Sequence, residues 1–225
     1  MQRISVIIPT LNEEKMIQTT LREIGEGVEI IVVDGGSTDN TVELAKQSGA
    51  RVFIPEKKGR SNQMNCGAEM ATGDIVLFLH ADTLVPEDYR ERIIETLACP
   101  GTIAGAFALR VEGEEKSLRF VEKMVEWRSR FLSLPYGDQG IFLRAKVFRE
   151  MGGFADLPIM EDFEFVKRLQ RRGKIILVPR PVVTSGRRWR KLGVWKTTLI
   201  NQLVILGYYL KVPPLTLARL YRSLI

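Results

Sequence analysis

The segment "EIIVVDGGSTDNTVELAKQSGARVFI" (residues 29–54) contains two apolar, β-branched runs separated by a turn and a polar stretch of helical length. Glu29–Val33 and Arg51–Ile54 each predict a buried strand. Ser37 can cap the helix expected between them, which ends near Gln47. A strand, a helix and a second strand in this order predict two parallel strands joined by a crossover helix.

The same alternation continues on both sides of this segment. Ile4–Ile8 predicts the first strand, and Thr10-x-x-Glu13 has the form of a capping box that opens a helix. A helix over about 63–71 and a strand over Ile75–Leu79 follow. We therefore predict an α/β fold with a Rossmann-like, mostly parallel sheet flanked by helices, which binds ligands beyond the carboxyl ends of its strands.

Further elements follow this half of the chain. We expect helices over about 86–98, 117–134 and 160–173, strands over 102–111 and 175–178, and a short strand running into a helix within 140–148. In the 117–134 helix, the inward side chains are predicted to be Leu118, Val121, Met124, Val125, Phe131 and Leu132. Residues 189–225 read as helical, with a break at Pro213-Pro214. The predicted division is a domain over 1–188 and a basic helical C-terminal extension over 189–225 that packs on it.

Charge is distributed unevenly along the chain. No Asp or Glu follows Glu164 in the last 61 residues, which contain 14 Lys and Arg, whereas the first 164 residues have 19 basic and 27 acidic side chains. This asymmetry indicates an anionic partner for the C-terminal third, either a phosphorylated ligand or an anionic membrane face. We predict no nucleic-acid partner because no nucleic-acid-binding motif is present.

Two cysteines, Cys66 and Cys99, provide no disulfide framework and suit a reducing compartment. The first residues do not resemble a signal peptide, and no apolar run approaches the ~20 residues of a membrane span. We therefore expect a cytoplasmic protein, with peripheral contact at the inner membrane face as an option. The 189–225 helices could also form a homo-oligomer interface.

Two carboxylates stand at the ends of predicted central strands. Asp34 follows "EIIVV" and Asp82 follows "DIVLFL", so both are expected at one edge of the sheet. Such a carboxylate can bind a nucleobase, a ribose or a hard cation. Alternatively, Asp34 and Ser37 simply build a turn. His80, the only histidine, lies beside Asp82.

The segments "SVIIPTLNEE", "VVDGGSTDNT", "GRSNQMNCGAEMATGD", "LFLHADT", "GGF…MEDFEF" and "SGRRW" occur in one order over about residues 3–190. Together they closely resemble the inverting family-2 glycosyltransferases of the GT-A fold. The resemblance implies a glycosyltransferase that uses a nucleoside diphosphate sugar and a divalent cation, Mg²⁺ or Mn²⁺. Within that family, the whole pattern looks especially like the radical-SAM/selenodomain-associated subgroup linked to arsenosugar biosynthesis, which would imply a small soluble acceptor. The segments that carry this closer resemblance are "GRSNQMN", "LHADT", "PYGDQGIF", "LPIMEDFE" and "SGRRWRKLGVWKTTLINQ".

The resemblance assigns the donor side as follows. His80-Ala81-Asp82 matches the DxD motif, with Asp82 as the carboxylate that contacts the metal and His80 in place of the first acid. His80 could therefore contact ribose, phosphate or Mn²⁺, or be satisfied by a backbone carbonyl. The remaining nucleotide-sugar residues implied are Pro9, Leu11, Glu13, Asp34, Arg60, Asn65 and Arg188.

The pair Glu161-Asp162 matches the family's "ED" motif, in which the aspartate takes the proton of the acceptor hydroxyl. A carboxylate at a helix N-terminus is held ionised by the helix dipole, which suits a general base. We predict Asp162 as the catalytic base and Glu161 as the residue that positions it or the acceptor. Acidic residues also favour first helical turns for stability alone.

Three more residues are predicted on the acceptor side. Asp138 and Gln139, in "LPYGDQG", could bind acceptor hydroxyls or form a tight turn. Trp189, in "SGRRW", could stack on a sugar, and its neighbour Arg188 could grip the diphosphate in a forked contact.

Two rival functions fit the same patterns. A membrane-associated polyprenyl-phosphate glycosyltransferase would rest its basic tail and the apolar patch Leu203–Leu210 on a bilayer. A non-catalytic nucleotide-sugar-binding protein would bind the donor without turnover. The intact Glu161-Asp162 pair favours an enzyme.

Overall fold

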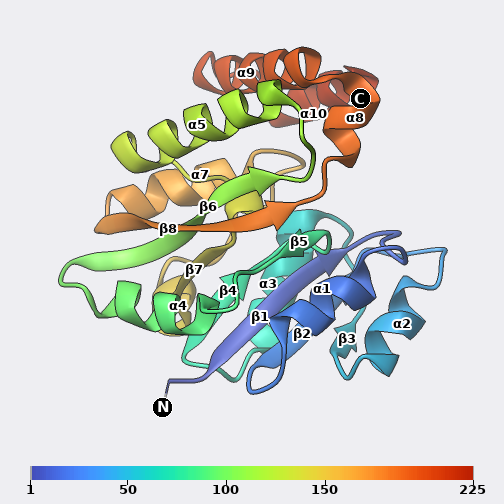
Figure 1. Cartoon of the computed structure of the whole chain (residues 1–225), viewed down its shortest axis with the longest axis vertical. Helices are drawn as coiled ribbons and strands as arrows, with labels where there is room; N and C mark the ends of the chain where they lie inside the picture. The colour runs from blue at the N-terminus through green and yellow to red at the C-terminus, as the bar shows by residue number, and fades with distance from the viewer. Residues whose placement is uncertain (1, 225) are drawn as a thin grey trace.

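A computed structural model describes residues 2–224, and within them one mixed sheet runs through the molecule in the order β3-β2-β1-β4-β7-β6-β8-β5 (Figure 1). Its strands are β1 (Ile4–Thr10), β2 (Glu29–Asp34), β3 (Arg51–Phe53), β4 (Ile75–Phe78), β5 (Thr83–Leu84), β6 (Thr102–Val111), β7 (Ile141–Arg144) and β8 (Lys174–Thr184). The longer helices are α1 (Ile17–Ile24), α3 (Arg60–Met70), α4 (Tyr89–Ala98), α5 (Lys116–Phe131), α7 (Glu161–Gln170), α9 (Val194–Tyr209) and α10 (Pro214–Leu224). Shorter ones are α2 (Thr41–Gln47), α6 (Ala145–Glu150), α8 (Arg187–Leu192) and the 3₁₀ turn η1 (Gly137–Gln139).

The first four long strands form the predicted parallel half of the sheet. β1 pairs in parallel with β2 and with β4, and β2 pairs in parallel with β3. Helices connect these strands, so both faces of β1 are covered, and the side chains of Val6, Ile7 and Ile8 are fully buried. The predicted α/β fold with a mostly parallel sheet is therefore confirmed.

The second half brings distant segments to the edge where β1, β2 and β4 end. β7 runs antiparallel to β4 with Ile141 opposite Phe78, so η1, which precedes β7, lies beside the residues that follow β4. β8 runs parallel to β6 and pairs with β5, with Thr184 opposite Thr83. The chain after β8 therefore returns to Asp82, whose carbonyl accepts a hydrogen bond from the Ser185 N–H at 3.1 Å.

The two predicted helix starts in this half were wrong. Thr10 is the last residue of β1 and is buried, so it does not cap a helix, and α1 begins only at Ile17. α2 begins at Thr41, where the Asp39 carboxylate accepts a hydrogen bond from the Thr41 N–H at 3.0 Å. Ser37 belongs instead to the turn after β2, where it binds Asp34. The Thr-x-x-Glu pattern spans only four residues, so it can also occur by chance at the end of a strand.

β8 extends well beyond the predicted strand Ile175–Val178. The register against β6 shifts between Phe107 and Ala108, which face Val178 and Pro181 respectively. Pro179 and Arg180 form the irregularity, because a proline cannot donate to a ladder and is accommodated at a bulge. The bulge lets β8 continue to Thr184 at the edge where the site forms.

The C-terminal helices pack beside α5 and α7 (Figure 1). The break at Pro213-Pro214 is confirmed, with Pro214 as the first residue of α10. The rings of Phe120 in α5 and Trp195 in α9 lie 6.0 Å apart. Among the residues predicted to face inward on α5, Leu118 and Val121 do so, whereas Met124, Phe131 and Leu132 are exposed.

The predicted boundary at residue 188 falls inside α8, and the division into two domains stays a prediction. Among residues 2–224, no helix is both long and apolar enough to cross a bilayer.

Candidate active site

The carboxyl edge of the parallel strands holds two groups of charged side chains. We call Glu13, Asp82 and Arg187 the donor rim, and Arg60, Glu161 and Asp162 the base rim. His80 is two residues from Asp82 in the sequence, and its pKa responds to charges of both rims. Sequence analysis predicted five of these six residues and His80.

In the donor rim, one arginine joins two carboxylates that are far apart in sequence. The Arg187 guanidinium donates to Glu13 Oε2 at 2.6 Å and to Asp82 Oδ2 at 2.9 Å. Both carboxylate side chains keep about a fifth of their surface exposed. Burial raises the pKa of Glu13, and the Arg187 charge only partly offsets this. The two carboxylates of the donor rim therefore bind one positively charged group, the Arg187 guanidinium.

Arg187 lies where a contact with the diphosphate was expected from Arg188, whose predicted role stays a prediction. The Arg188 guanidinium donates to the Tyr221 hydroxyl of α10 and to Asn201 Oδ1 of α9, the latter at 2.9 Å. Adjacent residues at the start of a helix point in different directions, about 100° apart. Trp189 is half-buried and packs against the hydrophobic core, and its stacking on a sugar stays a prediction.

Asp34 is buried in the turn that follows β2, with 1% of its surface exposed. Its Oδ2 accepts hydrogen bonds from the N–H groups of Gly36 and Ser37, both at 2.8 Å. The Ser37 hydroxyl donates to the other oxygen. The structure thus agrees with the turn-building alternative for Asp34, and the carboxylate is not open at the rim in this conformation.

Of the other residues predicted to bind the donor, some lie at the end of β1 and others form hydrogen bonds within the protein. Leu11 is 56% exposed directly after β1, and Pro9 is half-buried within that strand. Asn65 exchanges two 2.9 Å hydrogen bonds with the backbone of Phe154 through its side-chain amide, and its contact with the donor stays a prediction. Ala81 is buried, and its carbonyl accepts a hydrogen bond from Thr20 Oγ1 at 2.8 Å.

His80 is half-buried. Burial and the nearby Arg60 charge lower its pKa, although the carboxylates of Asp138, Asp82 and Asp162 act in the opposite direction. A lowered pKa favours the neutral imidazole at neutral pH, which can donate one hydrogen bond and accept another.

The base rim is fixed by backbone as well as by charge. Asp162 lies in the first turn of α7, where its Oδ2 accepts a hydrogen bond from the Gly137 N–H at 2.8 Å. Its Oδ1 accepts the Phe163 N–H, also at 2.8 Å. A side-chain carbon on Gly137 would lie only 2.8 Å from Asp162 Oδ2, so glycine is required for this approach.

Arg60 supplies the positive charge of the base rim. Its guanidinium binds the buried Glu161 and lies 3.9 Å from Asp162 Oδ2. Burial alone would raise the pKa of Asp162, but Arg60 and the two backbone donors outweigh it, so the pKa lies below its usual value. Asp162 is therefore held as a carboxylate, which is the form that accepts a proton.

Met160, which precedes this pair, has a left-handed backbone conformation with φ of +67°. Left-handed conformations are uncommon for residues other than glycine, and such strain costs about 1–3 kcal/mol. It turns the chain directly into α7 and so aims Glu161 and Asp162 at the site. Neither Met160 nor Gly137 carried a signal in the sequence that singled it out.

The predicted acceptor pair separates into one candidate and one structural residue. Gln139 is fully buried, where its Oε1 accepts three hydrogen bonds and its Nε2 donates to the Phe107 carbonyl at 3.0 Å. These hydrogen bonds agree with the tight-turn alternative for Gln139, and its acceptor role stays a prediction. Asp138 differs, because its Oδ1 is buried without a hydrogen-bond partner.

A divalent cation fits the donor rim only together with a ligand. Among residues 2–224 there is no group of three or more His, Cys, Asp or Glu side chains placed to hold a metal. Mg²⁺ commonly takes one or two protein carboxylates and completes its shell with substrate phosphates and water. The oxygens of Asp82 and Glu13, which converge on one cationic nitrogen, match that requirement.

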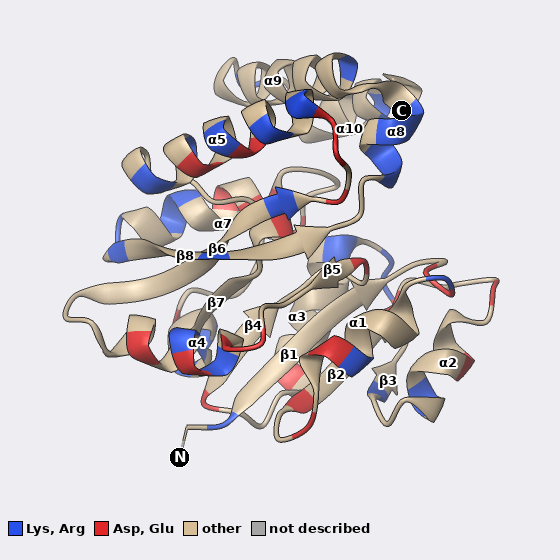
Figure 2. Ribbon diagram, in the orientation of Figure 1, with Lys and Arg blue, Asp and Glu red and all other residues tan. Residues whose placement is uncertain are grey.

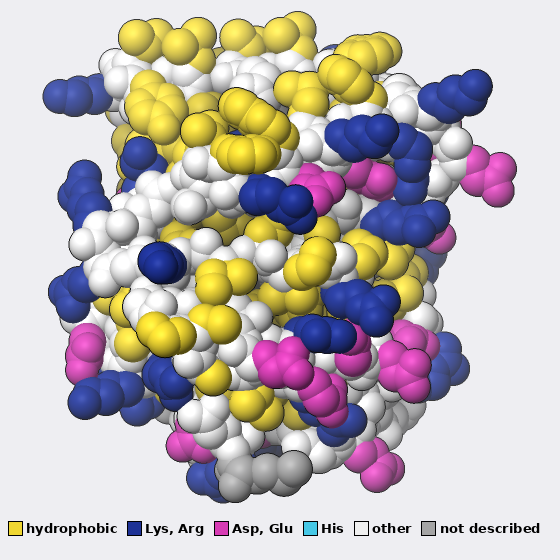
Figure 3. Space-filling view, turned by 60° about the vertical axis from the view of Figure 1, so that its left-hand side comes forward, with side chains coloured by type: hydrophobic (Ala, Val, Ile, Leu, Met, Phe, Trp, Pro, Cys, Tyr) yellow, Lys and Arg dark blue, Asp and Glu magenta, His cyan; other side chains and the backbone are white. Residues whose placement is uncertain are grey.

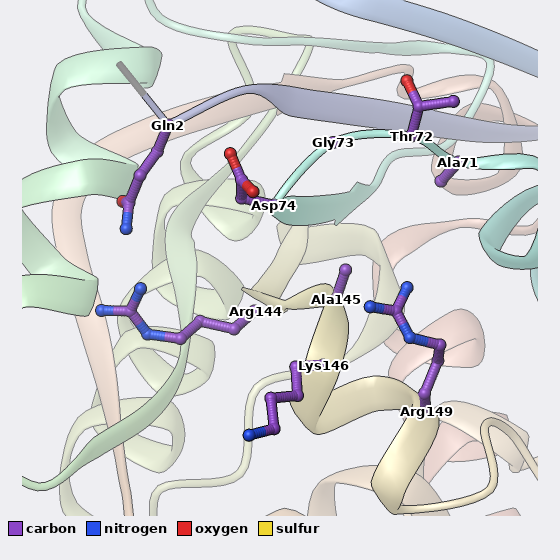
Figure 4. A pocket seen from close by; sticks show the side chains of 9 residues that line it. All are labelled: Gln2, Ala71, Thr72, Gly73, Asp74, Arg144, Ala145, Lys146 and Arg149. Atoms are coloured by element: carbon purple, nitrogen blue, oxygen red, sulfur yellow. The ribbon is translucent and has the colours of Figure 1, made fainter.

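A separate cavity of about 570 Å³ lies where β4 begins, away from both rims. Figure 4 shows the side chains of Gln2, Asp74, Arg144, Lys146 and Arg149 around it. It contains none of the predicted site residues.

Comparison with known proteins identifies the family and the fold of the chain. Among relatives, the chain is 30% identical over 145 residues to undecaprenyl-phosphate 4-deoxy-4-formamido-L-arabinose transferase of Pseudomonas aeruginosa, which covers 58% of this chain and 40% of that protein. The chain thus spans about two fifths of that relative's length.

Solved structures show the same fold. The mannosyltransferase PcManGT from Pyrobaculum calidifontis, in complex with GDP-Man and Mn²⁺, superposes with a TM-score of 0.71 at 23% identity, over 90% of this chain and 62% of that one. Glucosyl-3-phosphoglycerate synthase from Mycobacterium tuberculosis, with Mn²⁺, UDP and glucosyl-3-phosphoglycerate, gives 0.63 at 23% identity, over 88% and 79%. The glycosyl transferase family 2 profile matches residues 5–172, about three quarters of the sequence. The chain therefore belongs to glycosyltransferase family 2.

Proposed function

We propose that the protein transfers a sugar from a nucleoside diphosphate sugar to an acceptor hydroxyl with inversion, assisted by a divalent cation. The observation that carries the proposal is Asp162, an ionised carboxylate fixed by two backbone N–H groups and Arg60. A side chain held so firmly in its proton-accepting form suits a general base. The donor rim opposite it suits a diphosphate and its cation.

The chemistry follows from these positions. Asp162 takes the proton of the acceptor hydroxyl while that oxygen forms a bond to the anomeric carbon. The bond from the anomeric carbon to the diphosphate oxygen breaks, and the nucleoside diphosphate leaves with the electron pair. A cation held by Asp82 and Glu13 would neutralise charge on the leaving group. Attack on the face opposite the leaving group inverts the anomeric configuration.

Arg187 and His80 complete the donor side in this proposal. Displaced from its two carboxylates by the cation, the Arg187 guanidinium would still lie within reach of the diphosphate, to which it can donate two hydrogen bonds. The neutral His80 imidazole would donate to a ribose or phosphate oxygen. Fixed donors directed at developing negative charge usually supply the largest part of such catalysis.

Asp138 is the proposed acceptor contact, because its Oδ1 is buried without a hydrogen-bond partner and its charge acts on the pKa of His80. A hydroxyl of the acceptor would satisfy it.

The resemblance to the radical-SAM/selenodomain-associated subgroup and its small soluble acceptor stays a prediction, as do a cytoplasmic location and a homo-oligomer. The polyprenyl-phosphate alternative is supported by exposed apolar helices beside α7 and by the Pseudomonas relative's name.

A screen of UDP-, GDP- and dTDP-sugars, each with and without Mn²⁺, tests the proposal. Melting temperature and release of nucleoside diphosphate are followed in parallel for the wild type and for Asp162→Asn. We expect one nucleotide to stabilise the protein in a Mn²⁺-dependent way and to be released only by the wild type. Stabilisation with equal, negligible release from both proteins would instead identify a binding protein.

A further inference from the structure

The outward sides of α5, α9 and α10 form a continuous apolar surface, which we call the platform. Figure 3 shows hydrophobic side chains gathered over the top of the molecule, where these helices lie. Its most exposed members include Trp127 and Phe131 of α5, Trp195, Leu199 and Leu206 of α9, and Leu215 of α10, each 54–68% exposed. Isolated exposed apolar residues are ordinary, but a group spread over three adjoining helices marks an interaction site.

The composition of α9 shows that the platform lacks a partner. Ile200, Val204 and Gly207 face inward and are buried, while Leu199, Leu203 and Leu206 face outward and are 59%, 44% and 54% exposed. The exposed side of α9 also carries Lys196 and Gln202, so the helix presents a mixed face on which apolar side chains predominate. Such exposed leucines beside polar residues are typical of a helix that lies at an apolar boundary.

The charges on these helices restrict what that environment can be. Lys196, Lys211, Arg219 and Arg222 are exposed on or beside α9 and α10, and the chain has no acidic residue after Glu164 (Figure 2). The two acids within α5, Glu122 and Glu126, form ion pairs with Arg119 and Arg130. The exposed acids Glu112, Glu114 and Glu115 precede α5, and Glu112 pairs with Arg190. The platform thus combines an apolar centre with a net positive border.

We propose that the platform docks on the surface of an anionic lipid bilayer. Apolar side chains would enter the boundary between headgroups and acyl chains, while the basic border meets acidic headgroups, the two contributions that surface helices combine. At 16 residues, α9 is about 24 Å long and would lie in the plane of the interface. A second copy of the chain is the poorer occupant, because a two-fold interface would bring the two basic borders together.

Docking in this way would place the site close to the bilayer surface. The Phe163 ring, next to Asp162, contacts the rings of Tyr208 and Tyr209 at the end of α9, 5.0 and 5.8 Å between centroids. The proposal does not depend on sugar transfer, since a protein can dock without any turnover. Its failure would leave the transfer reaction untouched.

Flotation of the full chain with vesicles tests the proposal. We expect co-flotation with vesicles of 3:1 phosphatidylcholine and phosphatidylglycerol, and much less with phosphatidylcholine alone or at high salt. Trp195→Ser combined with Leu199→Gln should weaken binding at least tenfold, because two large apolar contacts are lost. Lys196→Gln combined with Arg222→Gln should weaken it roughly fivefold for each charge removed.

Matched controls lie on the opposite half of the molecule. Ile54→Gln replaces an apolar side chain that is 66% exposed beside β3, and Lys46→Gln removes an exposed charge from α2; neither should change vesicle binding. Circular dichroism confirms that each variant is folded. Absence of co-flotation, or binding indifferent to the platform variants, would overturn the proposal. Concentration-dependent dimers abolished by the platform variants, without vesicle binding, would identify a second copy as the occupant.

Discussion

The donor rim and the base rim are built from the same parts, two carboxylates and one arginine, yet they are held differently. Arg187 bridges Glu13 and Asp82 at 2.6 and 2.9 Å, and both carboxylate side chains remain about one fifth exposed. In the base rim, Glu161 is almost fully buried against Arg60. Asp162 is fastened in addition by two backbone N–H groups.

This difference indicates a division of labour. An exposed arginine bridge is worth little free energy, about 0–1 kcal/mol, and can be exchanged for a cation and a diphosphate. A carboxylate held by backbone donors cannot move without disturbing η1 and α7. The donor rim is therefore exchangeable, whereas the base rim is fixed before the substrates arrive.

Replacement of the fixed base should have the largest effect. Asp162→Asn keeps the shape of the side chain but cannot accept a proton, so kcat should fall by about 10²–10⁴ with little change in donor affinity. Steady-state kinetics on the donor that emerges from the screen measures this. The control is Glu164→Gln in the same helical turn, where Glu164 pairs with Arg168 outside the site. Equal losses in both variants would contradict the assignment.

Replacement of the exchangeable carboxylate should act on binding instead. Asp82→Asn should weaken Mn²⁺-dependent donor binding on the order of 100-fold, because the cation loses a charged oxygen ligand. Isothermal titration calorimetry with and without Mn²⁺ measures this effect. Glu91→Gln, at an exposed position of α4, serves as the control. Unchanged Mn²⁺ dependence in Asp82→Asn would show that the cation is held elsewhere.

The neighbouring arginines should separate binding from stability. Arg187→Gln should raise the donor KM roughly tenfold, since a charge-assisted contact to the diphosphate is lost. Arg188→Gln should leave KM unchanged and lower stability by about 1–3 kcal/mol, because its bonds to Tyr221 and Asn201 are lost. The donor KM and the thermal unfolding of both variants show which arginine contacts the diphosphate. A raised KM for Arg188→Gln with an unchanged KM for Arg187→Gln would support the prediction for Arg188 instead.

The smallest expected effect is on the pH profile. The pKa of Asp162 is lowered, and a base loses activity as the pH falls through its pKa, so the acid limb of kcat/KM should lie below the usual Asp value of about 3.9. Arg60→Gln removes the nearest positive charge and should move that limb upward, whereas Arg60→Lys should largely preserve it. An acid limb at the wild-type pH in both variants would show that Arg60 does not influence the pKa of Asp162.

The sequence was sufficient for the parallel half of the sheet, and it singled out the carboxylates of both rims, whose roles stay predictions. Short apolar runs such as Ile75–Leu77, bounded by polar residues, favour buried strands, and strand ends in a parallel sheet meet at one edge. Asp162 could be singled out because it belongs to the matched "ED" motif and lies at the start of a predicted helix. These features depend on residues close together in the sequence.

The features that the sequence did not reveal are the partners of polar residues, which are distant in the chain or lie on the backbone. Arg187 reaches Glu13 across 174 positions, whereas Arg188 turns to Tyr221, and nothing local distinguishes the two arginines. Asn65 and Gln139 look like ligand contacts, but they satisfy backbone groups of Phe154 and Phe107. Composition and spacing do not reveal which way such a side chain turns.

The most direct test measures donor affinity in the presence of Mn²⁺ and single-turnover transfer rate on Asp82→Asn and Asp162→Asn side by side. The account predicts a crossover, in which Asp82→Asn loses affinity while Asp162→Asn binds the donor like the wild type and loses the chemical step. If Asp162→Asn transferred sugar at the wild-type rate, or if both variants lost only affinity, the division between an exchangeable donor rim and a fixed base rim would be wrong.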